Sequence, residues 1–182
     1  MKRAFLAALS ASLLLSACAY GAGSTGSASS QPAMPGAPDK ARVSGGSYAV
    51  DSNHTLVTWT VDHFGFNNYR GQFAQASGTL ILNPTNVSAA QVDITLPMSG
   101  IVTGAEGLTK HLKSPDFFNA EVYPTARFVS TSVVPTGMDT AAINGNLTIG
   151  AITRPVTLNA NFHGAGNNPM SKKENVGFHA TA

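Results

Sequence analysis

The stretch Val57-Thr58-Trp59-Thr60-Val61 decides the fold class, because its apolar and polar residues alternate strictly. Alternation with a period of two predicts a strand that buries one face and exposes the other to water. The same pattern, or a run of strand-forming apolar residues, returns further along the chain at residues 91–96, 128–134, 143–149, 156–163 and 176–180. Short strands at near-regular spacing predict an all-β sandwich or barrel.

One segment interrupts this pattern. Within residues 104–118, Leu108, His111 and Leu112 follow the spacing of a helix, not of a strand. A proline removes a backbone donor and disfavours helix at the residue before it. The sequence therefore predicts one short helix near residues 105–118, ending at about Lys113, ahead of Pro115.

Composition sets limits on function. The chain has 182 residues, of which 43% are apolar and 11% are charged, and it contains one cysteine. A lone cysteine excludes an internal disulfide framework and a cysteine-based zinc site. Without residues 1–17, nine basic side chains balance nine acidic ones. A neutral domain has no electrostatic attraction for a phosphate backbone, so we expect no nucleic-acid partner.

The amino terminus has the layout of an export signal. Lys2 and Arg3 precede an apolar stretch that ends in small residues, which predicts a signal peptide over residues 1–17. The segment Leu15-Ser-Ala-Cys18 also resembles a bacterial lipobox, which implies that Cys18 is acylated and anchors the chain in a membrane. Residue 19 is not the aspartate associated with retention in the inner membrane, so we expect an outer-membrane lipoprotein facing the periplasm. Ordinary signal cleavage near Cys18 is the alternative.

A tether is predicted after the signal. Residues 18–46 begin at the lipidated cysteine and are rich in Gly, Ala, Ser and Pro, with few large apolar side chains. Such a composition buries too little surface to offset the entropy of ordering, so we expect a flexible segment. The folded domain is then expected over residues 47–182.

Several motifs of this domain, in order, resemble the YceI-like family, and the resemblance extends from Gly46 to the end of the sequence. They are Tyr48-x-Val-Asp51 with His54, Val61–Phe66 (VDHFGF), Gly71–Phe73 (GQF), His111–Phe118 (HLKSPDFF), Tyr123–Phe128 (YPTARF), Asn144–Ile149 (NGNLTI) and Arg154–Leu158 (RPVTL).

The resemblance implies an extended, antiparallel, lipocalin-like β-barrel whose apolar interior holds a polyisoprenoid lipid, such as an isoprenoid quinone, often in a homodimer. The sequence departs from the family pattern at two places. Leu108-Thr109 stand where many members have Arg-Asp, so roles given to that pair do not transfer. The sequence also ends at Ala182, where the family continues through further strands, so we expect a barrel that lacks its last strands or closes unusually.

A set of apolar side chains on the expected strands is predicted to line this interior and to bind the lipid. The set is Val57, Trp59, Val61, Val92, Ile94, Leu96, Phe128, Val156, Leu158, Phe162 and Phe178. The glycines at 71, 145 and 177 are expected to leave room for a ligand. His63 and His111 are predicted at the barrel mouth, where they could donate hydrogen bonds to a headgroup.

Two other functions compete with lipid binding. A metal or redox protein of the cell envelope would use His54, His63 and His111, although these residues form no recognised metal-binding spacing. A ligand-free envelope scaffold would fill its interior with its own side chains, with Trp59 as a plug. No G-x-S-x-G turn or activated carboxylate pair is present, so we expect neither an enzyme nor a resident cofactor or metal.

Overall fold

The computed structural model describes residues 33–182, and it is mostly β-structure with one α-helix. The predicted signal peptide and Cys18 lie outside the described residues. The strands are β1 (Gly46–Ala49), β2 (Val57–His63), β3 (Asn67–Phe73), β4 (Ser77–Leu82), β5 (Gln91–Pro97), β6 (Ile101–Thr103), β7 (Thr125–Pro135), β8 (Thr140–Ile149), β9 (Ile152–Asn167) and β10 (Glu174–Thr181). The helices are α1 (Glu106–Lys113) and the short 3₁₀ turns η1 (Lys40–Arg42), η2 (Val87–Ala89) and η3 (Met98–Gly100).

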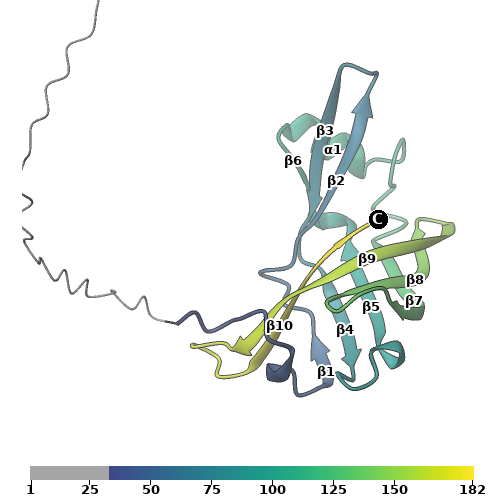
Figure 1. Cartoon of the computed structure of the whole chain (residues 1–182). Coiled ribbons are helices and arrows are strands. Elements are labelled where there is room, and N and C mark those ends of the chain that lie inside the picture. Colours follow the sequence, from purple (N-terminus) through teal and green to yellow (C-terminus); the bar gives the residue numbers. More distant parts are fainter. Residues whose placement is uncertain (1–32) are drawn as a thin grey trace, which may run out of the picture. The chain divides into compact units, whose positions relative to one another are not determined.

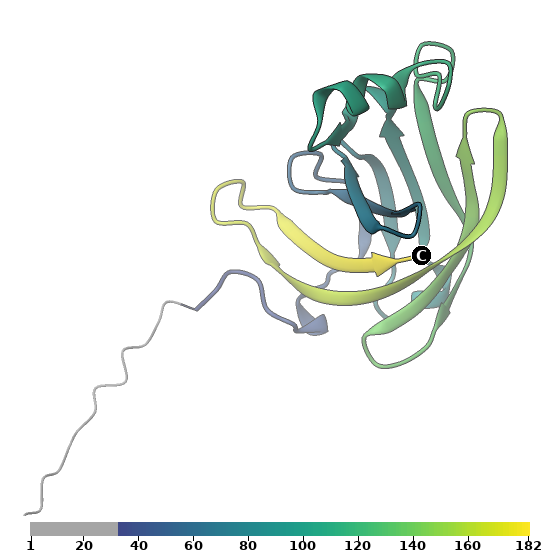
Figure 2. The ribbon, with the colours of Figure 1, turned by 90° about the horizontal axis from the view of Figure 1, so that it is seen from above.

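The strands form two antiparallel sheets. Seven strands pair in the order β1-β4-β5-β7-β8-β9-β10, and three pair in the order β2-β3-β6. Figure 1 and Figure 2 show that the seven-stranded sheet curls strongly, with β9 and β10 sweeping around one side. The result is a half-barrel, in which β1 and β10 are the two edge strands of the larger sheet. The predicted all-β, lipocalin-like fold class is therefore confirmed.

The helix α1 lies where the sequence predicts it. It ends at Lys113, and Ser114 caps it just ahead of Pro115. Its apolar face closes a core in which Leu112 packs with Phe73, Met98, Ile101 and Ala126. Phe118 adds to this core, because its ring packs edge-on against Phe73 with centroids 6.1 Å apart. Among the residues with structure, no helix is long and apolar enough to cross a bilayer.

Part of the predicted tether packs on the half-barrel. We call residues 35–44 the strap. Ala37 forms a β-bridge with Ala165 of β9, and Val43 is 9% exposed. Lys40 donates to the carbonyl of Met138. The segment was predicted to be flexible because it has few apolar side chains, whereas the structure holds it mainly by backbone and polar contacts, which composition does not reveal.

The strap ends in a polar cluster at β10. The Glu174 carboxylate accepts hydrogen bonds from the Ser44 amide (2.9 Å), the Ser44 hydroxyl (2.6 Å) and the Tyr48 hydroxyl (2.7 Å). These donors lower the pKa of Glu174, with the Ser44 hydroxyl contributing most. Burial, and then the hydrogen bond to Glu174, raises the pKa of Tyr48. The folded part of the chain therefore begins ahead of the predicted boundary at residue 47.

Candidate functional site

The predicted lining side chains of β5, β7, β9 and β10 share one face of the seven-stranded sheet, because the strand register aligns them. Ile94 of β5 lies opposite Phe128 of β7, and Phe128 lies opposite Leu147 of β8. Val92 and Leu96 lie on the same face of β5, because side chains two residues apart point to the same side of a strand. We call this face the inner face of the half-barrel.

The inner face continues across β9 and β10. Val156 lies opposite Gly145, and Leu158 lies opposite Ile143. Phe162 of β9 pairs with Phe178 of β10, and their rings meet edge-on with centroids 5.9 Å apart. An apolar row therefore runs from β5 to the edge strand β10.

The smaller sheet contributes to the same interior. Val57 and Trp59 of β2 pack against the core together with Leu96 and Ile149, which belong to the inner face of the larger sheet. Val61 is on the same side of β2 as Trp59, two residues nearer the β2–β3 turn. The predicted lining positions thus lie either on the inner face or on the side of β2 that carries Trp59.

The side chains that face this interior are buried to different extents. Phe128 is 6% exposed, whereas Val61 is 51% and Phe178 is 44% exposed. Val156, Leu158 and Phe162 are half-buried. The interior is therefore packed beside α1 and open toward β9, β10 and the outer half of β2, which leaves apolar surface in contact with solvent.

Two glycines predicted to leave room for a ligand instead accommodate aromatic rings. A Cβ at Gly71 would overlap the Trp59 ring, and one at Gly145 would overlap the Phe128 ring. The rings occupy the space that the missing side chains vacate, so the expectation of free volume there was wrong. The buried indole nitrogen of Trp59 has no hydrogen-bond partner among the described residues.

Two hollows within residues 33–182 are both shallow and open to solvent, and neither is formed by the inner-face residues of β5 to β10. One is at the β2–β3 turn, around Asp62 and Asn67. The other lies along the smaller sheet, around Thr58, Arg70 and Val102. The predicted lining residues therefore form an open apolar face.

The histidines predicted at the mouth do not act as a pair. His63 is at the end of β2, and its ring lies edge-on to Phe64. His111 lies edge-on to Phe117, with Nε2 3.3 Å from the Asp116 carboxylate. No hydrogen bond or ring contact joins His63 to His111 in residues 33–182. Each histidine is occupied by neighbours in its own segment.

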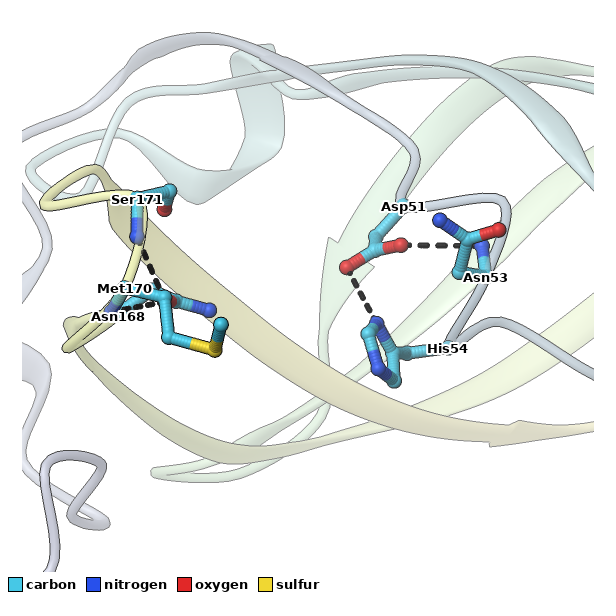
Figure 3. A network of polar contacts seen from close by, with 6 residues as sticks. All are labelled: Asp51, Asn53, His54, Asn168, Met170 and Ser171. Atoms are coloured by element: carbon cyan, nitrogen blue, oxygen red, sulfur yellow. Dashed lines mark hydrogen bonds and ion pairs between the residues drawn. The ribbon is translucent and has the colours of Figure 1, made fainter.

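His54 is held within its own loop. Figure 3 shows the Asp51 carboxylate accepting from the Asn53 amide (3.0 Å) and lying 2.8 Å from Nδ1 of His54. These contacts lower the pKa of Asp51, with the His54 hydrogen bond contributing most. The same view shows a second tight turn, in which Asn168 accepts from two amides. Among the described residues, no three His, Cys, Asp or Glu side chains gather as they would around a metal ion.

The sequence analysis missed several residues that line the interior, among them Leu147 and Ile143 of β8, Tyr69 of β3 and Arg154 of β9. Tyr69 lies opposite Val61, and its ring centroid is 6.4 Å from that of Trp59. The alternation of Tyr69 with Gly71 and Phe73 was the signal that could have found it. Arg154 lies opposite Leu147. Arg154 does not fit an alternation of apolar residues, so only the strand register shows that it lies on this face.

Fold and site together define a class of protein: a small all-β protein whose curled antiparallel sheet presents an apolar inner face, closed at one end by a short helix. A YceI-like domain model matches residues 48–182. The chain therefore belongs to the YceI-like family.

Relatives and solved structures agree with this membership. A UPF0312 protein of Pseudomonas putida strain F1 is 35% identical over 136 residues, which cover 74% of this chain and 70% of that protein. The crystal structure of a Campylobacter jejuni YceI protein matches with a TM-score of 0.56 and 27% identity, over 72% of this chain and 76% of that one. Burkholderia cenocepacia BcnA, at 17% identity, shares the fold with a TM-score of 0.55, over 78% of this chain and 97% of BcnA.

Proposed function

We propose that this protein is a lipid-binding protein, not an enzyme, and that it holds a polyisoprenoid such as an isoprenoid quinone against the inner face. The observation that carries the proposal is the apolar inner face that extends from β5 to β10, interrupted by Arg154, part of which stays exposed to solvent. Exposed apolar surface of this kind is typical of a binding site. Family membership supports the same reading.

The chemistry of the face suits a branched hydrocarbon. Burial of apolar surface contributes about 25 cal/mol per Å², so each five-carbon unit moved from water onto the face would contribute several kcal/mol before the cost of association. Affinity would then rise with chain length. The half-buried Leu158 and the exposed Phe178 would lose their remaining contact with water on binding.

The headgroup would need polar partners at the edge of this face. Arg154 is the charged residue that the register places among the inner-face side chains of β8 and β9. We also propose that His63 and His111 contact the headgroup separately, each from its own part of the chain.

Lipid recovery tests the binding proposal. Protein purified from its native host is extracted with solvent, and the extract is analysed by mass spectrometry. We expect a copurified long-chain isoprenoid, and Leu158→Trp should reduce its amount because the larger ring fills the inner face. Val129→Trp is the matched control, because Val129 is on the opposite face of β7 and is 38% exposed.

Two results would contradict the proposal. Repeated recovery of lipid-free protein from the native host would contradict lipid binding. Unchanged lipid content in a folded Leu158→Trp variant would place the ligand elsewhere. Lipid-free protein would favour the scaffold alternative, which the rings of Trp59 and Phe128 over Gly71 and Gly145 already support in part.

We further propose that the chain is an exported lipoprotein, attached through acylated Cys18 to the outer membrane and facing the periplasm. Growth with a labelled fatty acid should label the unsubstituted chain but not a Cys18→Ser variant. Label that persists in the variant would contradict acylation at this residue.

A further inference from the structure

The turn between β2 and β3 exposes two aromatic side chains. Phe64 is 84% and Phe66 is 87% exposed, so neither contributes appreciably to the core. Figure 1 shows this hairpin projecting at the end of the domain that carries α1. A group of exposed large apolar side chains is typical of a contact surface, whereas single exposed ones are common on protein surfaces.

The backbone at this turn is strained. The Phe66 amide donates to the His63 carbonyl (3.0 Å), and both central residues have positive φ, 55° for Phe64 and 75° for Gly65. Hairpin turns of this geometry strongly favour Asn-Gly, because a bulky side chain at positive φ is sterically disfavoured. Phe64 is therefore suited neither to the turn nor to the core, and strain of this kind clusters at functional sites.

The tip is also free of charge. The segment from Phe64 to Tyr69 contains no charged side chain. The nearest carboxylate, Asp62, is directed into the turn, where it accepts from the Gly65 amide at 2.7 Å. Uncharged residues with aromatic rings at the tip can enter the interface of a bilayer without the cost of burying an ion.

Other exposed apolar residues follow α1, at the same end of the domain. Phe117, which packs edge-on against His111 of α1, is 55% exposed, and Val122 is 62% exposed.

We propose that the β2–β3 turn is a bilayer-docking element, in which the rings of Phe64 and Phe66 insert into the lipid interface. Two phenylalanines can bury about 150–250 Å² each, well below the roughly 800 Å² per partner of a stable protein interface. A bilayer needs no matching surface and binds in proportion to the apolar area inserted. The element is separate from Cys18, and it does not depend on the identity of any lipid held by the inner face.

Fluorescence quenching by brominated lipid tests the proposal on the acylated protein. In a Trp59→Phe background, one variant carries Phe66→Trp at the tip and a matched variant carries Met170→Trp in the β9–β10 turn, where Met170 is 91% exposed. Vesicles of phosphatidylcholine and phosphatidylglycerol carry bromine on their acyl chains. We expect quenching several-fold stronger for the tip reporter, together with a blue shift.

Hydrogen exchange on the unsubstituted chain provides a second measurement, which does not depend on the folding of any variant. Vesicles should slow exchange in a peptide that spans residues 60–70 and leave one that spans 166–173 unchanged. Equal quenching of both reporters, or no change in the tip peptide, overturns the proposal. The proposal is also overturned if the emission of the tip reporter shifts to the blue as the protein concentration rises in the absence of vesicles. That result would mean that the tip docks on a second copy of the chain.

Discussion

Single residues in this protein show where local geometry and packing conflict. Phe64 occupies a backbone conformation that suits Asn or Gly, and it gains no burial in return. Gly71 and Gly145 show the opposite case, because each lacks a side chain where an aromatic ring needs the space. The free energy of unfolding should respond to substitutions at these positions in opposite directions.

Replacing Phe64 should stabilise the fold. The left-handed conformation costs an ordinary residue about 1–2 kcal/mol, and Asn tolerates it better than other residues. We expect Phe64→Asn to raise the free energy of unfolding by about 1 kcal/mol in urea denaturation. Phe66→Asn is the control, because Phe66 is equally exposed but is not among the residues with positive φ, and it should change stability little. Lower stability of Phe64→Asn would contradict the strain argument.

Adding a methyl group at Gly71 should destabilise the core. A Cβ there would overlap the Trp59 ring, so we expect Gly71→Ala to lower the free energy of unfolding by about 1–3 kcal/mol. Gly107→Ala in α1 is the matched control, because a Cβ there meets no atom within 4 Å. Alanine favours helix over glycine, so this control should gain about 0.5–1 kcal/mol. Equal effects of the two substitutions would show that Trp59 does not pack on Gly71.

Among the elements, the strap shows that a segment poor in apolar residues can still pack. Its contacts are the Ala37–Ala165 bridge, the bond from Lys40 to Met138 and the donors that Ser44 presents to Glu174. The helix α1 is the opposite case, because its apolar spacing predicted both its position and its end. Elements held by buried side chains leave a periodic pattern in the sequence, whereas elements held by backbone hydrogen bonds and isolated polar contacts leave none.

The end of the strap should respond to acid. The folded-state pKa of Glu174 is lower than its ordinary value of 4.5, so its contribution to stability is present at neutral pH and is lost as the pH falls through the folded-state pKa. We expect the amide resonance of Ser44 to titrate with a midpoint below the ordinary carboxyl value as the pH falls from about 7 to about 3.

Two variants check this assignment. Glu174→Gln should abolish the titration of the Ser44 amide, while Glu121→Gln should preserve it, because Glu121 makes no side-chain hydrogen bond within residues 33–182. A midpoint at or above the ordinary value in the unsubstituted chain would show that Glu174 does not accept these bonds in solution.

At the scale of the whole domain, the interior is divided between a packed end beside α1 and an open apolar face toward β10. The packed end accounts for folding, because Met98 and Ile101 are 1% exposed there. The open face accounts for the proposed binding. A molecule that binds the folded state alone stabilises it in proportion to the logarithm of its concentration over Kd.

A polyisoprenoid should therefore raise the melting temperature. Solanesol, a long-chain polyprenol, at about 100 times Kd would contribute about 2.7 kcal/mol, which corresponds to a shift of about 5–10 °C for a domain of this size. Differential scanning calorimetry of the protein in detergent, with and without solanesol, measures it. The shift should be lost in Leu158→Trp and kept in Val129→Trp. An equal shift in both variants would place binding away from the inner face.

The sequence by itself predicted six of the ten strands in residues 33–182, namely β2, β5, β7, β8, β9 and β10, and the single α-helix, because periods of 2 and 3.6 residues are local properties of the chain. Family membership followed from motifs that are equally local. Only the tertiary structure showed that the strap packs on β9, that Trp59 and Phe128 cover glycines, and that Phe64 remains exposed at positive φ. The first two depend on which distant residues come to lie side by side, and long-range contacts of that kind leave no periodic pattern in the sequence.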